Sequence, residues 1–340
     1  MHLTARGAQS FPPARIDALL KPLDRFRLPL IAVSGGPDST ALLLMAAHRA
    51  ERSARRIAAA TVDHGLRAES AVEAQAAAKL CDKLGVPHQT LVWTGPKPAA
   101  GVQERAREAR YRLLAAHARA IAADAIVTAH HADDQAATVL LRLLRGSGIA
   151  GLRGMVAMSA RDGIVLVRPL LGVPKADLVA FCRARGAAFI EDPSNADSRY
   201  ARAALGPLLA QLAEHGLDRD ALLRLARRAA EADEALARAA AELEAPLARE
   251  RLIHARALFA APIAVVQRVL AHRLAEAGGR DASRIGLEKV EALARAIADA
   301  LAEGRAFRAN VGGAIARLSA DGELEFAPEP PRRGAGAGSP

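Results

Sequence analysis

Apolar residues in the first half of the chain fall into short continuous runs that alternate with longer periodic stretches. The runs have the length and composition of buried strands, and they span residues 30–33, 57–62, 88–93 and 125–129. The stretches between them have helical spacing, and they span residues 39–50, 69–84, 102–122 and 133–144. This alternation predicts an α/β fold, a doubly wound and mostly parallel sheet with helices on both faces.

The pattern changes after residue 207, where strand-like runs give way to helical stretches rich in Ala, Leu, Arg and Glu. These stretches span residues 218–244, 262–277 and 287–303. Residues 307–326 alternate loosely around two glycine turns, which predicts a small hairpin, and the Pro- and Gly-rich end is typical of disorder. We predict a first domain over 1–212, a mainly helical region over 213–328 and a disordered tail over 329–340.

The 340-residue chain has a formal net charge of +10, and nearly all of its positive charge is arginine. A basic balance can mark a polyanionic partner, because contacts to phosphates supply much of the affinity for nucleic acid. A coding bias would also produce a chain rich in Ala and Arg and poor in Lys. Charge alone therefore leaves nucleic-acid binding and a merely basic surface as equal alternatives.

Two cysteines, Cys81 and Cys182, are far apart, and each lies in an apolar, helix-like stretch. No C-x-x-C pair is present, so the sequence offers no zinc ribbon, iron–sulfur cluster or redox pair, and we predict two buried thiols. The apolar run at 28–33 is far too short to span a membrane, and the first residues lack a long apolar core. These features predict a soluble, cytoplasmic protein.

A glycine-rich turn follows the first predicted strand and precedes a predicted helix. Its residues are Ser34, Gly35, Gly36, Pro37, Asp38 and Ser39. Glycines let backbone N–H groups approach a phosphate, and the start of a helix adds the positive end of a dipole. No Gly-Lys-Ser/Thr follows, so the turn is not a Walker loop. We predict a phosphate-binding loop of another kind, against the alternative of an ordinary turn with a serine N-cap.

Asp38 is an unusual residue to place among phosphates, because its carboxylate repels them unless a cation lies between. We therefore hypothesise that Asp38 binds Mg²⁺. The pairs Asp63-His64 and His130-His131 at strand ends raise the alternative of a zinc site. Adjacent residues of an extended chain point in opposite directions, so packing or contact with phosphate is the better interpretation of these histidines.

The loop resembles the pyrophosphate-binding loop of the PP-loop ATP-pyrophosphatase superfamily. Further segments resemble, in the same order, motifs of the tRNA(Ile)-lysidine synthetase family, and they lie at residues 62–67, 106–111, 129–135, 145–152, 168–171 and 191–197. The resemblance is dense over residues 28–210 and fades beyond them. Several motifs in a fixed order are far more specific than a single glycine-rich turn.

The resemblance implies a C–N bond-forming ligase that uses ATP and Mg²⁺. ATP would adenylate the C2 carbonyl oxygen of the wobble cytidine in the minor isoleucine tRNA with a CAU anticodon. The ε-amine of free L-lysine would then attack C2 and give lysidine, AMP and diphosphate. The Arg-rich helices of the C-terminal region would bind the body of the tRNA. The oligomeric state is left open, with a homodimer among the alternatives.

The resemblance also implies roles for individual residues. His130 would meet developing charge on the α-phosphate, with Arg107 or Arg110, three residues apart on one helix face, as electrostatic clamps. Catalysis is assigned to Asp38, Arg107, His130 and Asp134. Beyond the loop, ATP binding is assigned to Asp63 and His64. Substrate binding is assigned to Arg110, Asp134, Asp192, Asn195 and Arg202.

Some of these assignments have a purely structural alternative. Arg107 and Arg110 would also suit a solvated basic face of a helix. Asp133 and Asp134 lie where a helix is predicted to begin, which is where a capping carboxylate is expected. The functional interpretation places Asp134 in the pocket, where it binds Mg²⁺ or the ammonium group of lysine.

The chain departs from the family pattern at two places. The pattern usually has Glu three residues after the second Asp of the segment at 129–135, and this chain has Ala137. It usually reads Arg-Asn-x-aliphatic-Arg after the Asp-x-Ser-Asn segment, whereas residues 202–206 read Arg-Ala-Ala-Leu-Gly and end on Gly206. The first change concerns recognition of lysine, for which Glu104 or Glu108 would be a substitute, and the second concerns contact with tRNA phosphate.

Three other functions are alternatives. A tRNA thiolase needs a cysteine pair or a catalytic cysteine, and Cys81 and Cys182 form no pair. An amidotransferase-type synthetase needs a glutaminase segment with a nucleophilic cysteine, and the sequence shows none. A catalytically weakened ATP- or tRNA-binding relative is the third, and the departures at Ala137 and Gly206 favour it.

Overall fold

The chain divides into two compact units. The first comprises Met1–Leu144 and Gly154–Ala226, and the second comprises Arg145–Arg153 and Arg227–Pro340. The short segment Arg145–Arg153 thus belongs to the same unit as the C-terminal region. The predicted boundary after residue 212 stays a prediction. The computed structural model describes residues 11–65, 70–95, 102–190, 205–247, 252–282 and 285–330.

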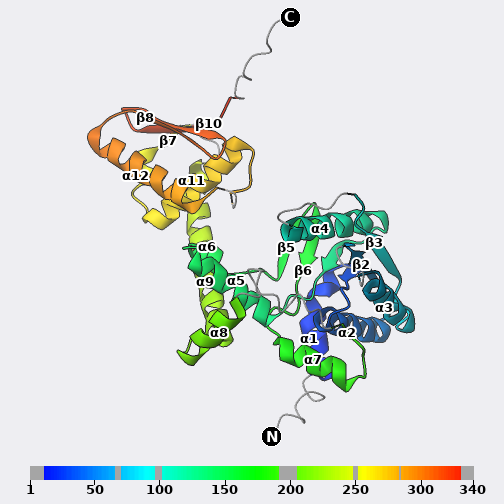
Figure 1. Ribbon diagram of the computed structural model, residues 1–340. Helices are drawn as coiled ribbons and strands as arrows, with labels where there is room; N and C mark the ends of the chain where they lie inside the picture. Colours follow the sequence, from blue (N-terminus) through cyan, green and yellow to red (C-terminus); the bar gives the residue numbers. More distant parts are fainter. Residues whose placement is uncertain are drawn as a thin grey trace, which may run out of the picture. The chain divides into compact units, whose positions relative to one another are not determined.

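A six-stranded sheet forms the centre of the first unit (Figure 1). Its strands are β1 (Pro29–Ala32), β2 (Ala58–Asp63), β3 (His88–Val92), β4 (Ala125–Val127), β5 (Met158–Arg161) and β6 (Ile164–Val167). Their order is β3-β2-β1-β4-β6-β5, and all neighbours are parallel except β5 and β6. The predicted fold class is confirmed. The chain order reverses between β1 and β4, and ligands of such sheets bind beyond the strand ends at this point.

Helices cover both faces of this sheet (Figure 1). One face carries α1 (Pro13–Leu20), the 3-10 helix η1 (Lys21–Arg25), α2 (Pro37–Ser53), α3 (Ser70–Lys83) and α7 (Lys175–Ala184), and the other carries α4 (Val102–Ala120). Successive residues of a strand point to opposite faces, so Ile31 packs in the core beneath α2 whereas Leu30 packs against α4. Both faces are buried, which is why these strands are continuous apolar runs.

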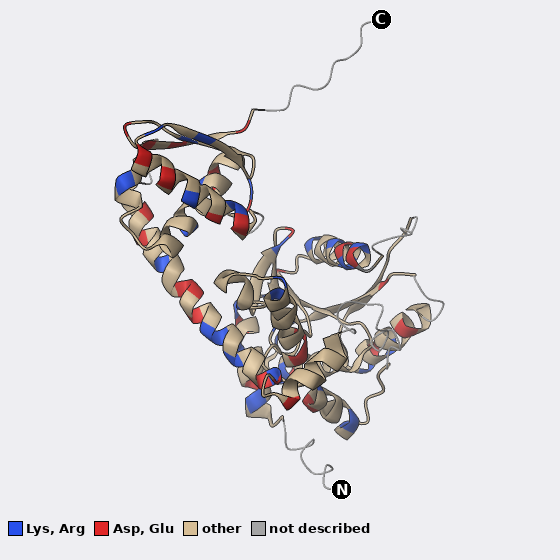
Figure 2. Ribbon diagram, turned by 60° about the vertical axis from the view of Figure 1, so that its left-hand side comes forward, with Lys and Arg blue, Asp and Glu red and all other residues tan. Residues whose placement is uncertain are grey.

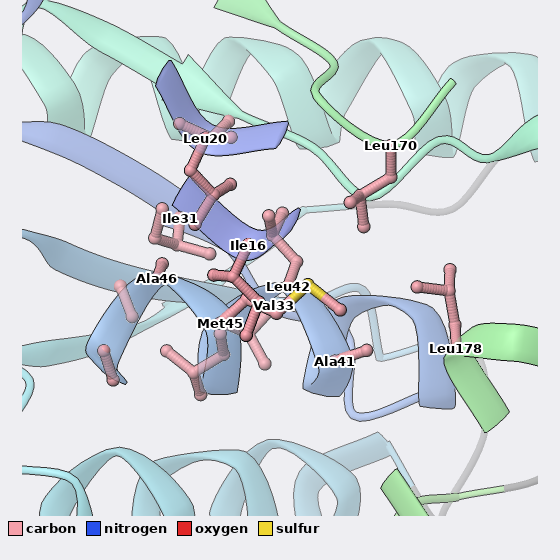
Figure 3. Close-up of a cluster of buried hydrophobic side chains, with 14 of the residues drawn as sticks. Ile16, Leu20, Ile31, Val33, Ala41, Leu42, Met45, Ala46, Leu170 and Leu178 are labelled. Atoms are coloured by element: carbon pink, nitrogen blue, oxygen red, sulfur yellow. The ribbon is translucent and has the colours of Figure 1, made fainter. Parts of the chain in front are cut away.

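The core beneath α2 is built from aliphatic side chains, as Figure 3 shows. Leu42 and Met45 of α2 lie between Ile31 of β1, Ile16 of α1 and Leu178 of α7. Burying each such Leu or Ile stabilises the fold by roughly 1.5–3 kcal/mol. This packing holds the first turn of α2 against the end of β1, where the predicted loop lies.

The start of α2 differs from the prediction. The helix begins at Pro37 rather than at Ser39, and Gly36 occupies the N-cap. Proline suits the first helical position because it lacks the N–H that would be unpaired there and its φ is already helical. The serine N-cap is therefore wrong, and Asp38 and Ser39 lie within the first turn, whose amides have no partner inside the helix.

An antiparallel hairpin of β5 and β6, which the apolar pattern did not predict, forms one edge of the sheet. Asp162 and Gly163 make its turn, with φ values of 50° and 73°. Asp-Gly with both φ values positive is the favoured two-residue connection of a hairpin. Each strand has only four residues, too few for a clear period.

A smaller apolar cluster of the first unit joins α5 (Ala132–Leu144), α8 (Leu205–Glu214) and the first residues of α9 (Arg219–Glu244). Val139 and Leu140 of α5 are buried here against α8 and α9. This contact fixes the orientation of α5, whose first turn follows the end of β4.

The second unit contains a four-stranded antiparallel sheet covered by helices. Its strand order is β7-β10-β9-β8. The predicted hairpin is wrong in extent, because this part of the chain forms the three strands β8, β9 and β10, and β10 also pairs with β7. None of the described helices is long and apolar enough to cross a membrane. The elements are α6 (Ile149–Leu152), η3 (Ala245–Leu247), β7 (Leu252–His254), α10 (Ala255–Leu258), α11 (Ile263–Gly278), α12 (Leu287–Glu303), β8 (Phe307–Val311), β9 (Ala314–Leu318) and β10 (Glu323–Pro328).

A buried carboxylate ties the segment Arg145–Arg153 to the helices of the second unit. Positive and negative residues alternate along α9 (Figure 2), but Asp233 differs from the rest because its side chain is only 7% exposed. Arg153 donates to Asp233 over 2.9 Å, and Arg268 of α11 donates to its other oxygen. A charge this buried is stable only with such partners.

Replacing Asp233 with Ala should destabilise the second unit by about 1–3 kcal/mol, because two guanidinium groups then lose their buried partner. Denaturant unfolding combined with amide hydrogen exchange of residues 252–282 measures the change. The control is Glu234→Ala, since Glu234 is 74% exposed and its pair with Arg238 is expected to contribute little. Equal losses in the two variants would contradict this account.

Candidate active site

The loop at the end of β1 has a backbone conformation that favours glycine, and it contacts Ile190. Gly35 has φ +83°, and a Cβ there would lie 2.9 Å from Cδ1 of Ile190. The N–H of Ile190 donates to the Gly35 carbonyl over 2.9 Å. The chain after α7 therefore lies against the loop and holds it in one conformation. This conformation bares the backbone, as a phosphate-binding loop requires.

Two serine hydroxyls fasten the loop across its base. Ser39 Oγ accepts the N–H of Ser34 over 3.0 Å and donates to the carbonyl of Gly36 over 3.1 Å. The two hydroxyl oxygens lie 3.1 Å apart. Beside them, the thiol of Cys182 donates to the carbonyl of Pro37 over 3.4 Å. The loop is thus held by side chains that point inward, which leaves its amides for a ligand.

A histidine that lies between β4 and α5 brings three carboxylates together. Nε2 of His131 lies 3.5 Å from Oδ2 of Asp38 and 3.5 Å from Oδ2 of Asp134. Its Nδ1 lies 3.6 Å from Oδ2 of Asp133. The His131 side chain is 7% exposed. The loop after β1 and the turn after β4 therefore meet in one site, as the order of strands requires.

The surroundings of His131 set its protonation. Burial lowers its pKa, but the hydrogen bond to Asp38 and the charges of Asp134, Asp38 and Asp133 outweigh burial, so the pKa lies above the ordinary 6.5. In the neutral ring, Nδ1 accepts the backbone N–H of Asp134 over 3.3 Å, which places the proton on Nε2, facing Asp38. Either form of the ring can bond to the carboxylates.

Asp133 and Asp134 also act as caps, which was the structural alternative. The Asp134 carboxylate accepts the N–H of His131, the residue before α5, over 3.2 Å. Asp133 accepts the N–H of Lys175, the first residue of α7, over 2.8 Å. Capping leaves each carboxylate with further acceptor capacity. The two roles are therefore compatible.

Asp38 has an oxygen that no group of the described residues satisfies. Within that part of the chain, Oδ1 is buried and has no hydrogen-bond partner, whereas Oδ2 faces His131. A buried anionic oxygen without a partner costs free energy, and binding a cation or a ligand's donor would remove this cost. Burial raises the pKa of Cys182 to about 12, and the charge of Asp38 contributes to this rise.

The other predicted nucleotide residues have structural roles of their own. Oδ1 of Asp63 accepts from the N–H of Gly65 over 2.9 Å and from the hydroxyl of Ser70 over 2.6 Å, which ties the end of β2 to the start of α3. His64 follows Asp63 beyond β2, at the same edge of the sheet as the loop. Both residues stay predictions as contacts of ATP.

His130 does not join the carboxylate cluster. Its Nδ1 lies 2.8 Å from Oγ1 of the buried Thr128. Arg107 is exposed and lies over the ring of Tyr111, while Arg110 is half-buried on the same helix. Three further predicted residues, Asp192, Asn195 and Arg202, lie outside the described residues.

Sequence reasoning considered His131 only for zinc, packing or contact with phosphate, and it overlooked the place at the centre of the site that the structure gives this residue. Two signals were available. His131 precedes a predicted helix, and Asp134 follows three residues later, which is the spacing at which a first-turn side chain reaches back to the N-cap. The contact with Asp38 lies between residues 93 positions apart in the sequence and has no local signal.

Comparison with known proteins agrees with the loop and the sheet. A family model described as a PP-loop domain matches residues 12–212. The solved structure of the U34-tRNA thiolase NcsA from Methanococcus maripaludis, with its [4Fe-4S] cluster, has a TM-score of 0.53. It covers 63% of this chain and 76% of that chain at 17% identity, and this likeness shows the fold alone. Fold and loop together define a PP-loop protein.

Curated relatives narrow the class. The tRNA(Ile)-lysidine synthase of Methylobacterium nodulans is 49% identical over 311 residues, which are 89% of this chain and 91% of the relative. That of Bradyrhizobium sp. is 42% identical over 94% of this chain and 95% of the relative. The chain therefore belongs to the tRNA(Ile)-lysidine synthase family.

The pH dependence of stability should report the His131 cluster. Because the folded-state pKa is raised, the stabilisation by His131 is fully present below pH 6.5 and is lost as pH rises through the folded pKa. The difference in unfolding free energy between the native chain and His131→Asn should therefore shrink as pH rises above 6.5. Urea unfolding without metal or nucleotide measures it.

His117→Asn is the control for this experiment. Burial lowers the pKa of His117, so its effect on stability should change with pH in the opposite direction. A pH-independent difference for His131→Asn would show that the imidazole does not hold the carboxylates by its charge.

Proposed function

We propose that this chain joins free L-lysine to C2 of the wobble cytidine in the minor isoleucine tRNA that has a CAU anticodon, and that it uses ATP to do so. ATP transfers its adenylyl group to the C2 oxygen and releases diphosphate. The ε-amine of lysine attacks C2 and displaces AMP, which leaves lysidine. The observation that carries this proposal is the loop at Gly35 beside Asp38 in a chain of this family.

The loop binds the phosphates of ATP. Its glycines leave the backbone accessible, and the unpaired amides of the first turn of α2 carry partial positive charge. Ser34 and Ser39 hold this shape through their mutual hydrogen bonds. Asp63, the last residue of β2, and His64, which follows it, contact the nucleoside part of ATP.

Asp38 would hold Mg²⁺. Carboxylate oxygens are the ligands that this ion prefers, and the partnerless Oδ1 of Asp38 fits it. The ion supplies neutralisation of the charge on the phosphates. His131 is a positioning residue, because it contacts the carboxylates of Asp38 and Asp134 and keeps them together before any cation arrives.

Lysine needs a partner for a cationic group in a site that lacks the family's usual Glu. Ala137 lies in the apolar cluster of α5, α8 and α9, so its methyl group packs rather than binds. Asp133 and Asp134, with side chains 46% and 27% exposed, are the carboxylates next to it. We assign the ammonium group to this pair, instead of to Glu104 or Glu108, which are exposed on α4.

His130, Arg107 and Arg110 serve the transfer step. Positive groups and hydrogen-bond donors at the α-phosphate stabilise the charge that develops there. The hydroxyl of Thr128 bonds to Nδ1 of His130 and so orients its ring. Asp192, Asn195 and Arg202 contact the tRNA, whose body is bound by the C-terminal unit. The oligomeric state, including a homodimer, does not enter the chemistry.

Lysine-dependent release of diphosphate in the presence of this tRNA tests the function. Asp38→Asn should lower its rate by about 100-fold or more, the scale of losing one preorganised electrostatic group. The control is Asp82→Asn, since Asp82 is exposed at the end of α3. Release that does not depend on lysine favours a different acceptor reaction, and nucleotide binding without release favours a weakened relative.

The thiolase alternative requires a reactive cysteine, whereas Cys81 and Cys182 are both buried. Burial raises the pKa of Cys81 to about 12, and burial and the charge of Asp38 do the same for Cys182. Iodoacetamide at about pH 8 should therefore leave both thiols unmodified in the folded chain, because the thiolate is the reactive form. The chain in urea is the control. Rapid alkylation of the folded chain would support the thiolase.

A further inference from the structure

Four arginines gather around one tyrosine on the face of the sheet that α4 covers. Tyr111 of α4 is buried against that face. On β6, Leu166 points to this face and Val167 to the other, so the alternation brings Arg168 back to the α4 side. The hairpin register pairs Arg161 with Ile164, which packs in the same cluster. Two strands and one helix thus direct their arginines to one face of the sheet.

Two guanidinium groups stack on Tyr111. The Cζ atom of Arg161 lies 4.2 Å from the centre of its ring, and that of Arg107 lies 5.2 Å away. Stacking holds a guanidinium by its flat surface and leaves the donors around its edge available. Arg161 is 37% exposed and Arg107 is exposed, so these donors reach solvent.

Arg168, on the same face of the sheet, is only partly satisfied. Its Nη1 donates to the carbonyl of Val156 over 2.8 Å and to Oγ of Ser159 over 3.1 Å, while its buried Nε has no partner among the described residues. Burial lowers its pKa, and the charges of Arg107 and Arg161 lower it further. Burial and Arg107 also lower the pKa of Arg110.

This positive charge has little opposing charge nearby. Among the described residues, the only carboxylate within ion-pair distance of these four arginines is Asp162, 3.7 Å from Arg161 at the tip of the hairpin. Four guanidinium groups held together repel one another, and burial of Arg168 adds a cost of desolvation. An anionic ligand would offset both costs.

We propose that the two hairpin arginines Arg161 and Arg168, which we call the arginine cluster, bind the phosphate backbone of the substrate RNA. Arg107 and Arg110 keep their assignment to the transfer step. The proposal rests on the function proposed above. Planar, stacked guanidinium groups match phosphate oxygens with two donors at a time, which a lysine cannot do.

The phosphates of ATP are the other source of the same chemistry. Asp38 and the loop belong to the α2 side of the sheet, since Val33 packs beneath α2. The arginine cluster belongs to the α4 side. We therefore assign the cluster to RNA, and the experiment separates the two sources.

The test is the salt dependence of tRNA binding by Arg161→Gln in the full chain. Binding of the CAU-anticodon isoleucine tRNA transcript is measured over a range of KCl concentrations. Loss of one phosphate contact should reduce the slope of log K against log [KCl] by about 0.7 to 0.9. The matched control is Arg112→Gln, which removes an exposed arginine of α4 that lies outside the cluster and should keep the slope. The affinity for ATP is measured in both variants.

An unchanged slope in Arg161→Gln, with the native melting temperature, would overturn the proposal. So would a weaker affinity for ATP with an unchanged tRNA slope, which would assign the cluster to the nucleotide. An equal reduction of the tRNA slope in Arg112→Gln would show only the general effect of removing a positive charge, and it would also overturn the proposal. The binding slope is measured without lysine, so it stays informative if the native chain makes no lysidine, the result that would refute the proposed function instead.

Discussion

The candidate site depends on one buried imidazole among three carboxylates. Asp38 comes from the loop after β1, and Asp133 and Asp134 come from the first turn of α5 after β4. Without His131 these carboxylates would repel one another, and burial would strengthen the repulsion. With His131 in the middle, the loop and α5 stay in contact across the point where the order of strands reverses. The site is therefore built before any ligand binds, which is the condition for electrostatic catalysis.

This arrangement has a cost that suggests its use. His131 satisfies one oxygen of Asp38 and leaves the other buried without a partner. A site intended only for stability would pair both oxygens or replace the acid with an apolar residue. The partnerless oxygen, the bare backbone at Gly35 and the amides of α2 point instead to a ligand that brings both positive and negative charge. A nucleotide with its metal ion has that composition.

The sequence was most informative where local patterns decide the structure. Periodicity predicted the parallel strands and their helices, because strands buried on both faces are continuous apolar runs. It failed for β5 and β6, whose four residues each are too few to show a period, and for β7, which pairs with β10 far along the chain. Asp38 was predicted from its loop, but His131 was overlooked because its contact with Asp38 is long-range. Chemistry that depends on tertiary contacts has no local signal.

The two faces of the sheet carry side chains of opposite charge. On the α2 side, carboxylates surround His131, and they suit a metal ion and the ammonium group of an amino acid. On the α4 side, arginines surround Tyr111, and they suit an RNA backbone. Val127 of β4 pairs with Val167 of β6, and Thr128 and Arg168 directly follow them. His130, which bonds to Thr128, therefore lies at the carboxyl end of β4, the strand next to the one that Arg168 follows. A reaction that joins a cationic amino acid to a polyanion requires such a separation, because either substrate would be repelled by the other's binding surface. The sheet lies between the two surfaces, so each retains its own sign of charge.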